Sequence, residues 1–194
     1  MAQDYNPEIA AAIRAFLGEK DWQYLFQKKK GLFHFYTRIR GTLGKIQYIV
    51  EVFQDSYLVV AYSPLFAKPD DPAQMKNMAE FVCHANYRSL CGNFNLDFDD
   101  GELHYKCYVN CEGIQPSQAV IRYSIYRPAE MFTRYNDAIV QIMVNDMPAS
   151  EAVARCEEAE LSDPEPDDQE TDIMQWIRNM PIPPAEKPGD GEQE

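Results

Sequence analysis

Residues 32–62 read LFHFYTRIRGTLGKIQYIVEVFQDSYLVVAY, and this stretch decides the fold. It is rich in Phe, Tyr, Ile and Val, the residue types that favour β-strands. Two turn signals interrupt it, at Gly41–Gly44 and at Asp55-Ser56. The pattern predicts three antiparallel strands, over about 31–40, 45–54 and 57–63.

A two-residue turn at Asp55-Ser56 would make both faces of these strands apolar. It would pair Phe53 with Leu58 and Val52 with Val59, leaving apolar side chains on either side. A sheet with one side in water alternates more cleanly. We therefore expect helices over one face, and a partner, the chain's own tail or a second copy over part of the other. Four residues of this second face are candidate partner-binding residues: Ile49, Phe53, Leu58 and Val60.

Residues 93–111, NFNLDFDDGELHYKCYVNC, predict a β-hairpin around a type I′ turn at Asp100-Gly101. The inner pairs of this register are apolar, and they are Phe98 with Leu103, Leu96 with Tyr105, and Phe94 with Cys107. The outer pairs are polar, and they are Asp97 with His104 and Asn95 with Lys106. Agreement of both faces is typical of a correctly paired hairpin.

Helices are predicted before, between and after these strands. The first begins at Asn6-Pro7-Glu8 and runs to about Gly18. The second begins at Asp71-Pro72 and ends near Cys91-Gly92. Residues 22–27 fit either an extended segment or a helix.

After the hairpin, Ser117 caps a helix that Pro128 breaks or kinks. A further helix follows with Met131 to Met143 on its apolar side, and a short one is expected at 149–159. The fold class is α+β, with an antiparallel sheet of about five strands (a three-strand meander plus a hairpin) and helices packed on it.

Charge divides the chain into residues 1–156 and 157–194. The formal net charge of the 194 residues is −13, and residues 157–194 carry −11 of it, which leaves −2 for the rest. We expect an α+β domain at 1–156 and an acidic, mostly disordered tail at 157–194. A short amphipathic island at 172–180 interrupts the tail, with four apolar residues at i, i+3, i+4 and i+7 that are further candidates for partner binding: Ile173, Trp176, Ile177 and Met180.

Residues 20–45 form a basic segment, with seven Lys or Arg against one acid. It is either a solubilising rim or a docking strip for something acidic, which could be the tail itself. Basic residues among aromatics can also bind single-stranded nucleic acid. The acidic tail opposes that function, so we expect no nucleic acid as partner.

The five cysteines are an odd number, which argues against a complete disulfide framework. The N-terminal residues lack the features of a secretory signal, and no stretch approaches the ~18 apolar residues of a membrane span. We expect a cytoplasmic protein with reduced thiols and no membrane association.

Motifs for chemistry are weak. Four cysteines, Cys83, Cys91, Cys107 and Cys111, with His84 and His104, lack the paired spacing of a zinc site. The acidic run 97–102 has Asp100 where a calcium loop needs Gly, and Gly41–Lys45 is too short for a P-loop. We expect no catalytic, cofactor or metal residues and no enzyme. The alternative is a small-molecule-binding or zinc-binding protein that uses the Cys and His residues.

Three segments resemble the YbjN-type family of bacterial proteins, which are assigned to sensory-transduction regulation. They are AYSPLFAKPDDPAQMKNMAEFVCHANY, GNFNLDFDDGELHYKCYVNCEG and PSxAVIxxSIYRPAEMFxRYNDAIVQIM, and the likeness covers about residues 20–146. The resemblance implies a fold like that of the small type III secretion chaperones. It also implies a non-enzymatic regulatory or chaperone-like protein that acts through protein contacts, often as a homodimer, without a cofactor. Asn86 matches the family pattern, and we expect its amide to bond backbone in the core or to contribute to binding.

Overall fold

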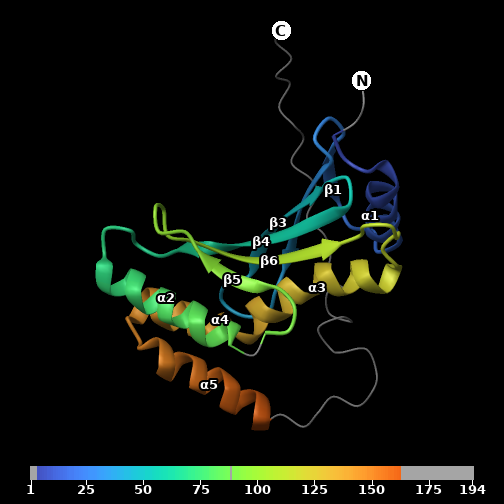
Figure 1. Ribbon diagram of the computed structural model, residues 1–194. Helices are drawn as coiled ribbons and strands as arrows, with labels where there is room; N and C mark the ends of the chain where they lie inside the picture. Colours follow the sequence, from blue (N-terminus) through green and yellow to red (C-terminus); the bar gives the residue numbers. More distant parts are fainter. Residues whose placement is uncertain (1–3, 88, 163–194) are drawn as a thin grey trace.

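The computed structural model describes residues 4–87 and 89–162, which form an α+β fold. Within those residues lies one antiparallel sheet of six strands, in the order β1-β2-β3-β4-β6-β5 (Figure 1). The strands are β1 (Tyr24–Gln27), β2 (Leu32–Arg38), β3 (Lys45–Val52), β4 (Ser56–Phe66), β5 (Asn93–Leu96) and β6 (Glu102–Asn110). The helices are α1 (Pro7–Glu19), α2 (Pro72–Asn86), α3 (Gln118–Arg134), α4 (Asn136–Asn145) and α5 (Ala149–Ser162).

The sheet has one strand more than predicted, because the ambiguous segment 22–27 contains β1. Phe26 and Tyr24 of this strand pair with Phe33 and Phe35 of β2. Their rings lie 4.4 Å (Phe26–Phe33) and 5.6 Å (Tyr24–Phe33) apart between centroids. These aromatic contacts favour the extended conformation for a segment whose own sequence is ambiguous.

The predicted pairing of β3 with β4 is wrong by two residues. Val52 pairs with Tyr57 and Val50 with Val59, so the turn is Gln54-Asp55 rather than Asp55-Ser56. The other neighbour of β4 sets this register, because β6 pairs with β4 as far as Ser56 and the Cys111 amide donates to the Asp55 carbonyl (2.8 Å). A shift of two leaves every side chain that remains in a strand on its predicted face.

The second hairpin is also shifted by two, with Leu96 paired to Leu103 and Phe94 to Tyr105. Phe98 therefore lies in the turn and is exposed. The reason is local hydrogen bonding: the Asp97 carboxylate accepts from the Asp99 amide (2.8 Å), and the Gly101 amide donates to the Asp97 carbonyl (3.0 Å). These bonds stabilise a longer turn than the two-residue type I′ turn.

The three helices that follow Asn6, Asp71 and Ser117 begin as predicted, and the first of them also ends within one residue of the predicted Gly18. Asn6, Asp71 and Ser117 each accept hydrogen bonds from the first turn of their helix. Helix α2 ends at Asn86, five residues before the predicted end. Pro128 lies inside a continuous α3, and the break comes at Tyr135 instead.

Helix α3 continues through Pro128 because its inner side packs against the sheet, with Ile125, Ala129 and Phe132 all buried. This burial offsets the backbone hydrogen bond that proline removes. Helix α5 reaches Ser162, so the helical part of the chain extends six residues into the region predicted to begin the tail at 157.

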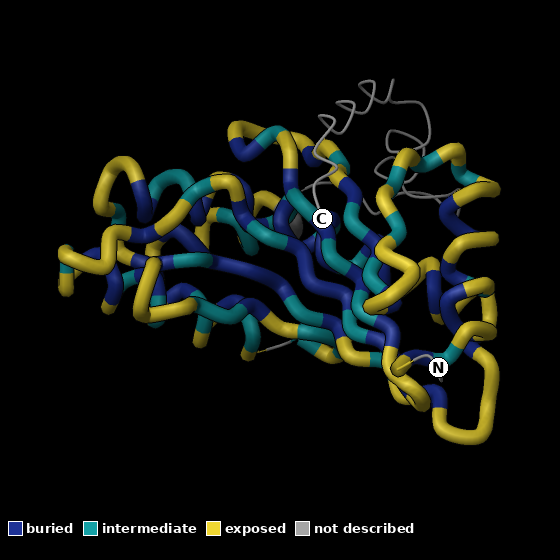
Figure 2. The backbone as a smooth tube through the Cα atoms, turned by 90° about the horizontal axis from the view of Figure 1, so that it is seen from above, coloured by how far each residue is buried: buried dark blue, intermediate teal, exposed yellow. Residues whose placement is uncertain are grey.

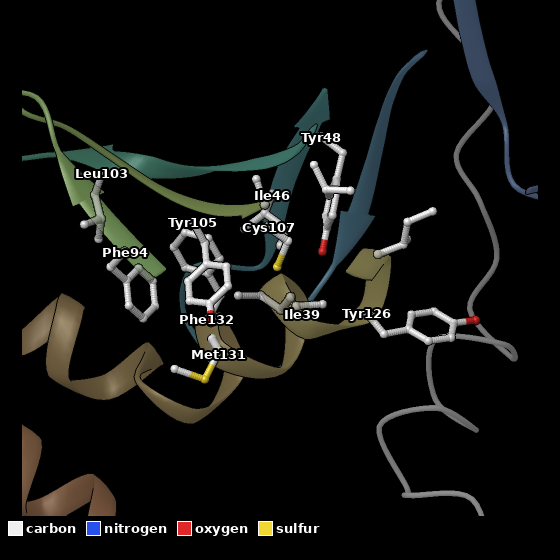
Figure 3. Packing of buried hydrophobic residues seen from close by; sticks show 14 of the residues in the cluster. Ile39, Ile46, Tyr48, Phe94, Leu103, Tyr105, Cys107, Tyr126, Met131 and Phe132 are labelled. Carbon is white, nitrogen blue, oxygen red and sulfur yellow. The ribbon is translucent and has the colours of Figure 1, made fainter. Parts of the chain in front are cut away.

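The five helices of the described residues all lie on one side of the sheet, with α5 packed outside α2 and α4 (Figure 1). The core lies between these layers, where Phe94 is surrounded by aromatic rings (Figure 3). Its ring centroid lies 4.9 Å from that of Tyr105 and 5.2 Å from that of Phe132, both in edge-on geometry. Edge-to-face pairs contribute beyond the area they bury.

Side-chain amides on α2 connect this helix to its neighbours. Asn86 accepts from the Phe94 amide (2.8 Å) and donates to the Phe94 carbonyl (2.9 Å). Gln74 accepts from the Lys68 amide (2.8 Å) and donates to the Met143 carbonyl (3.1 Å). The predicted backbone-bonding role of Asn86 is confirmed, and Gln74 has the same role at the other end of the helix.

Asn86→Ala should lower the free energy of unfolding by about 2–4 kcal/mol, because two backbone groups of buried Phe94 lose their partner. Denaturant unfolding measures this change. The control is Asn95→Ala on the same strand, whose amide bonds only to the Asn93 carbonyl in an exposed position. It should cost no more than about 0.5 kcal/mol. Equal losses in both variants would contradict the structural role of Asn86.

Gly101→Ala should destabilise the protein more than Gly113→Ala. Both glycines have positive φ, +77° and +72°, which costs about 1–2 kcal/mol for an alanine. Only Gly101 also lies against backbone, because a Cβ there would collide with the Ala67 carbonyl, whereas Gly113 has nothing within 4 Å. Thermal unfolding of the two variants separates the effect of the contact from that of the backbone conformation.

Candidate functional site: the outer face of the sheet

The side of the sheet opposite the helices, here called the outer face, is not covered by any helix of the described residues (Figure 1). Strand residues alternate between this face and the core. Buried and partly exposed positions are therefore interspersed along the strands (Figure 2). The outer face carries both polar and apolar side chains. Its apolar and aromatic members include Leu25, Tyr36, Ile49, Leu58, Val60, Tyr62 and Tyr108.

Three of the predicted partner-binding residues share this face. Ile49 pairs directly with Val60, and Leu58 lies two residues before Val60 on β4. Ile49 and Leu58 are partly exposed, whereas Val60 is only 6% exposed in the middle of the sheet and offers little surface.

Phe53 does not belong to this group, because β3 ends at Val52 and Phe53 lies in the turn before β4. The predicted tail residues lie outside the described part of the chain, and they are Ile173, Trp176, Ile177 and Met180.

A groove of about 580 Å³ runs across one end of the outer face. It lies where β4 departs from regular pairing with β6, between Tyr62 and Phe66. Such an irregularity bends a strand and redirects its side chains. Four strands line the groove, with Tyr36, Lys45, Gln47, Ile49, Tyr62, Ser63, Pro64, Phe66 and Glu102.

The groove combines aromatic surface with a cation at its rim. The Lys45 ammonium lies 4.2 Å from the centroid of the Tyr36 ring. Tyr36 is 50% exposed and Phe66 52% exposed, so both rings present area to a partner. An aromatic surface beside a positive charge suits an apolar segment that carries acidic residues.

His104 is the buried titratable group of the outer face. Its Nδ1 lies 3.0 Å from the Glu102 carboxylate, which can only accept, so Nδ1 carries the proton of the neutral ring. Burial lowers the pKa of His104 and the Lys106 charge acts in the same direction, while Glu102 opposes them. The Tyr62 ring packs beside this ring in a tilted arrangement, with 5.6 Å between centroids.

The basic segment 20–45 does not form one strip. Lys28, Lys29 and Lys30 lie in the turn from β1 to β2, whereas Arg38 pairs with Lys45 at the opposite end of β2. Of the two interpretations of this segment, a solubilising rim or a docking strip, the single docking strip is therefore wrong. Antiparallel pairing separates residues that are close in sequence by the length of a strand.

A second hollow of about 320 Å³ lies on the helix side, beside the turn from β2 to β3. That turn contributes Arg40 and Gly41, and α5 contributes Arg155, Cys156 and Ala159. Arg134 of α3 adds a third guanidinium to the lining. The turn from β2 to β3 thus separates two hollows, one on each side of the sheet.

The Cys and His residues are distributed over both sides of the sheet. Cys107 is buried in the core, His104 lies on the outer face, and Cys83 is exposed on α2. Burial and the neighbouring Cys91 thiol raise the pKa of the Cys107 thiol, which disfavours the thiolate that a metal requires. In residues 4–87 and 89–162, no three His, Cys, Asp or Glu side chains are arranged to hold a metal ion.

Sequence reasoning missed the groove residues Tyr36, Tyr62 and Phe66, and it included Lys45 only as part of the basic segment 20–45. A signal for two of them was present, because Tyr36 and Tyr62 have the same parity on their strands as His34 and Val60 of the outer face. Phe66 has the same parity as Val60 and Tyr62, but it lies beyond residue 63, where the third strand was predicted to end.

Comparison of the sequence with protein-family models and with curated proteins finds no match to either. The resemblance to the YbjN-type family therefore remains an expectation. None of the described helices is both long and apolar enough to span a membrane.

The stability of the protein should fall between pH 7 and pH 5.5 because of His104. The unfolded ring takes up a proton near pH 6.5, but the folded ring does so only at lower pH. The unfolded state thus binds more protons below pH 6.5, and the free energy of unfolding falls there while remaining intact above it.

Urea unfolding at several pH values measures this slope, and His104→Gln should flatten it. An unchanged slope in the variant would assign the pH dependence to other groups.

Proposed function

We propose that this protein is a non-enzymatic interaction module that binds a protein partner through the outer face. The observation that carries the proposal is the one-sided packing: all five described helices cover the inner face, while Tyr36, Ile49 and Phe66 remain accessible on the other. Exposed apolar surface with a polar surround is typical of protein-binding sites.

The shape of the outer face favours a protein segment over a small molecule. Small-molecule pockets bury most of their ligand, whereas this groove crosses four strands and is bordered by exposed aromatic rings. Aromatic residues are enriched in the centres of protein interfaces. A partner segment lying across the strands would contact Tyr36, Ile49 and Tyr62 together.

The resemblance to the YbjN-type family supports a regulatory or chaperone-like role for this binding, in the bacterial cytoplasm. A second copy of the chain is another occupant that the resemblance allows. In either case the apolar area supplies the affinity, and Lys45, Glu102 and Lys106 contribute orientation.

Tyr36→Glu should weaken partner binding about tenfold or more, because an unpaired carboxylate buried in the interface costs more than about 1.4 kcal/mol. The full-length chain is used as bait in an extract of its cell of origin, and captured proteins are compared between variants by quantitative mass spectrometry. Light scattering of the purified chain measures its oligomeric state in parallel.

The matched control is Tyr123→Glu on α3, because Tyr123 is also a tyrosine with 50% exposure but lies on the helix side. Circular dichroism verifies that both variants fold. Loss of a captured protein, or of a dimer, only in Tyr36→Glu supports the proposal. Identical capture and identical oligomeric state in both variants would contradict it.

A further inference from the structure

We infer that residues 172–180 bind in the outer-face groove of their own domain, where they occupy the surface that a partner would use. This inference rests on the proposed function of the outer face and adds its regulation. Four observations support it: where the described chain ends, how far the following residues can reach, which charges lie along the way, and what the groove accepts.

The tail begins near the turn from β2 to β3, which borders the groove. Ala159, three residues before the end of α5, lines the hollow on the helix side together with Arg40 of the turn from β2 to β3. The groove lies on the other side of the same turn, where Tyr36 and Lys45 line it. A chain leaving α5 therefore reaches the groove by passing around this single turn.

The length of the connecting segment is sufficient. Residues 163–172 are ten residues, which span up to about 33 Å when extended. Arg40 and Tyr36 are four residues apart, about 13 Å along a strand. The connection can therefore pass the turn with length to spare, and the short tether gives an effective concentration of the order of millimolar.

The charges along this route are complementary. Residues 163–172 contain six acidic residues and no basic one. The turn from β2 to β3 is flanked by Arg38, Arg40 and Lys45. Arg134 and Arg155 line the hollow where the route starts, and Arg155 also pairs with Glu151 (2.6 Å). Each exposed ion pair is weak and screened by salt. Together these charges therefore favour the approach of the segment to the groove but contribute little to its affinity.

The apolar contacts must supply the affinity, and both surfaces provide them. Ile173, Trp176 and Ile177, followed by Met180, repeat at the spacing of one helix side. The groove offers aromatic and aliphatic side chains on three strands: Tyr36, Ile49, Tyr62 and Phe66. Prolines at 181, 183 and 184 end the repeat directly after Met180, which matches a short segment in a short groove.

Trp176 reports on this contact, because the chain has only two tryptophans. The other, Trp22, packs against Phe35 at 5.2 Å between ring centroids. Subtracting the emission of Trp176→Phe from that of the parent isolates Trp176 in the full-length protein. We expect a blue-shifted emission and weak quenching by acrylamide, with partial reversal of both at high salt.

Ile49→Glu places a charge in the groove, and it should return Trp176 to the emission and quenching of a solvent-exposed tryptophan. Tyr36→Glu at the rim is the second variant, in case Ile49→Glu does not fold. Tyr123→Glu on α3 is the control and should leave Trp176 unchanged.

The inference would be overturned if Trp176 in the parent had the emission of a solvent-exposed tryptophan. It would also be overturned if Trp176 had a blue-shifted emission that neither groove variant changed. Emission that changes with protein concentration would place the segment on a second copy and overturn the intramolecular contact. Failure of the proposed function would be seen in a different measurement. In that case Tyr36→Glu would not change partner capture, whatever the emission of Trp176. If both ideas hold, Trp176→Ala should increase partner capture over the parent.

Discussion

Hydrogen bonding of backbone by the amides of one helix is the interaction on which the rest of the structure depends. Asn86 bonds both outward-facing backbone groups of Phe94 on β5, the last strand of the sheet. Gln74, twelve residues earlier on α2, joins the loop after β4 to the end of α4. These bonds satisfy backbone groups that burial would otherwise leave unpaired, and they hold the helix layer against one face of the sheet.

The one-sided helix layer determines where binding can occur. Because the described helices all pack on the inner face, none of them shields the apolar residues of the opposite side from water. The central Val60 is almost fully buried, whereas the groove around Tyr36 and Phe66 lies at the irregular end of β4. The same turn from β2 to β3 borders both the groove and the arginine-lined hollow near the end of α5, which connects the site to the origin of the acidic tail.

The face of the sheet on which a residue lies was easier to predict than the pairing register of the strands. Both hairpins are shifted by two residues from prediction, yet Val50, Val59 and Tyr105 lie on the core side as expected. Alternation depends only on whether a residue number is odd or even, so a shift of two does not disturb it. The turns themselves depend on the hydrogen bonds of Asp97 and on the pairing of β4 with β6, which involves residues about fifty positions apart.

The sequence by itself determined the α+β class, the caps at Asn6, Asp71 and Ser117, and the apolar character of both faces of the central strands, because these follow from local propensity and periodicity. Only the tertiary structure decided that β1 joins the sheet, that α3 passes through Pro128, and that the basic residues separate into two turns. Each of these depends on contacts between distant segments, whose energies outweigh the local preferences that a sequence displays.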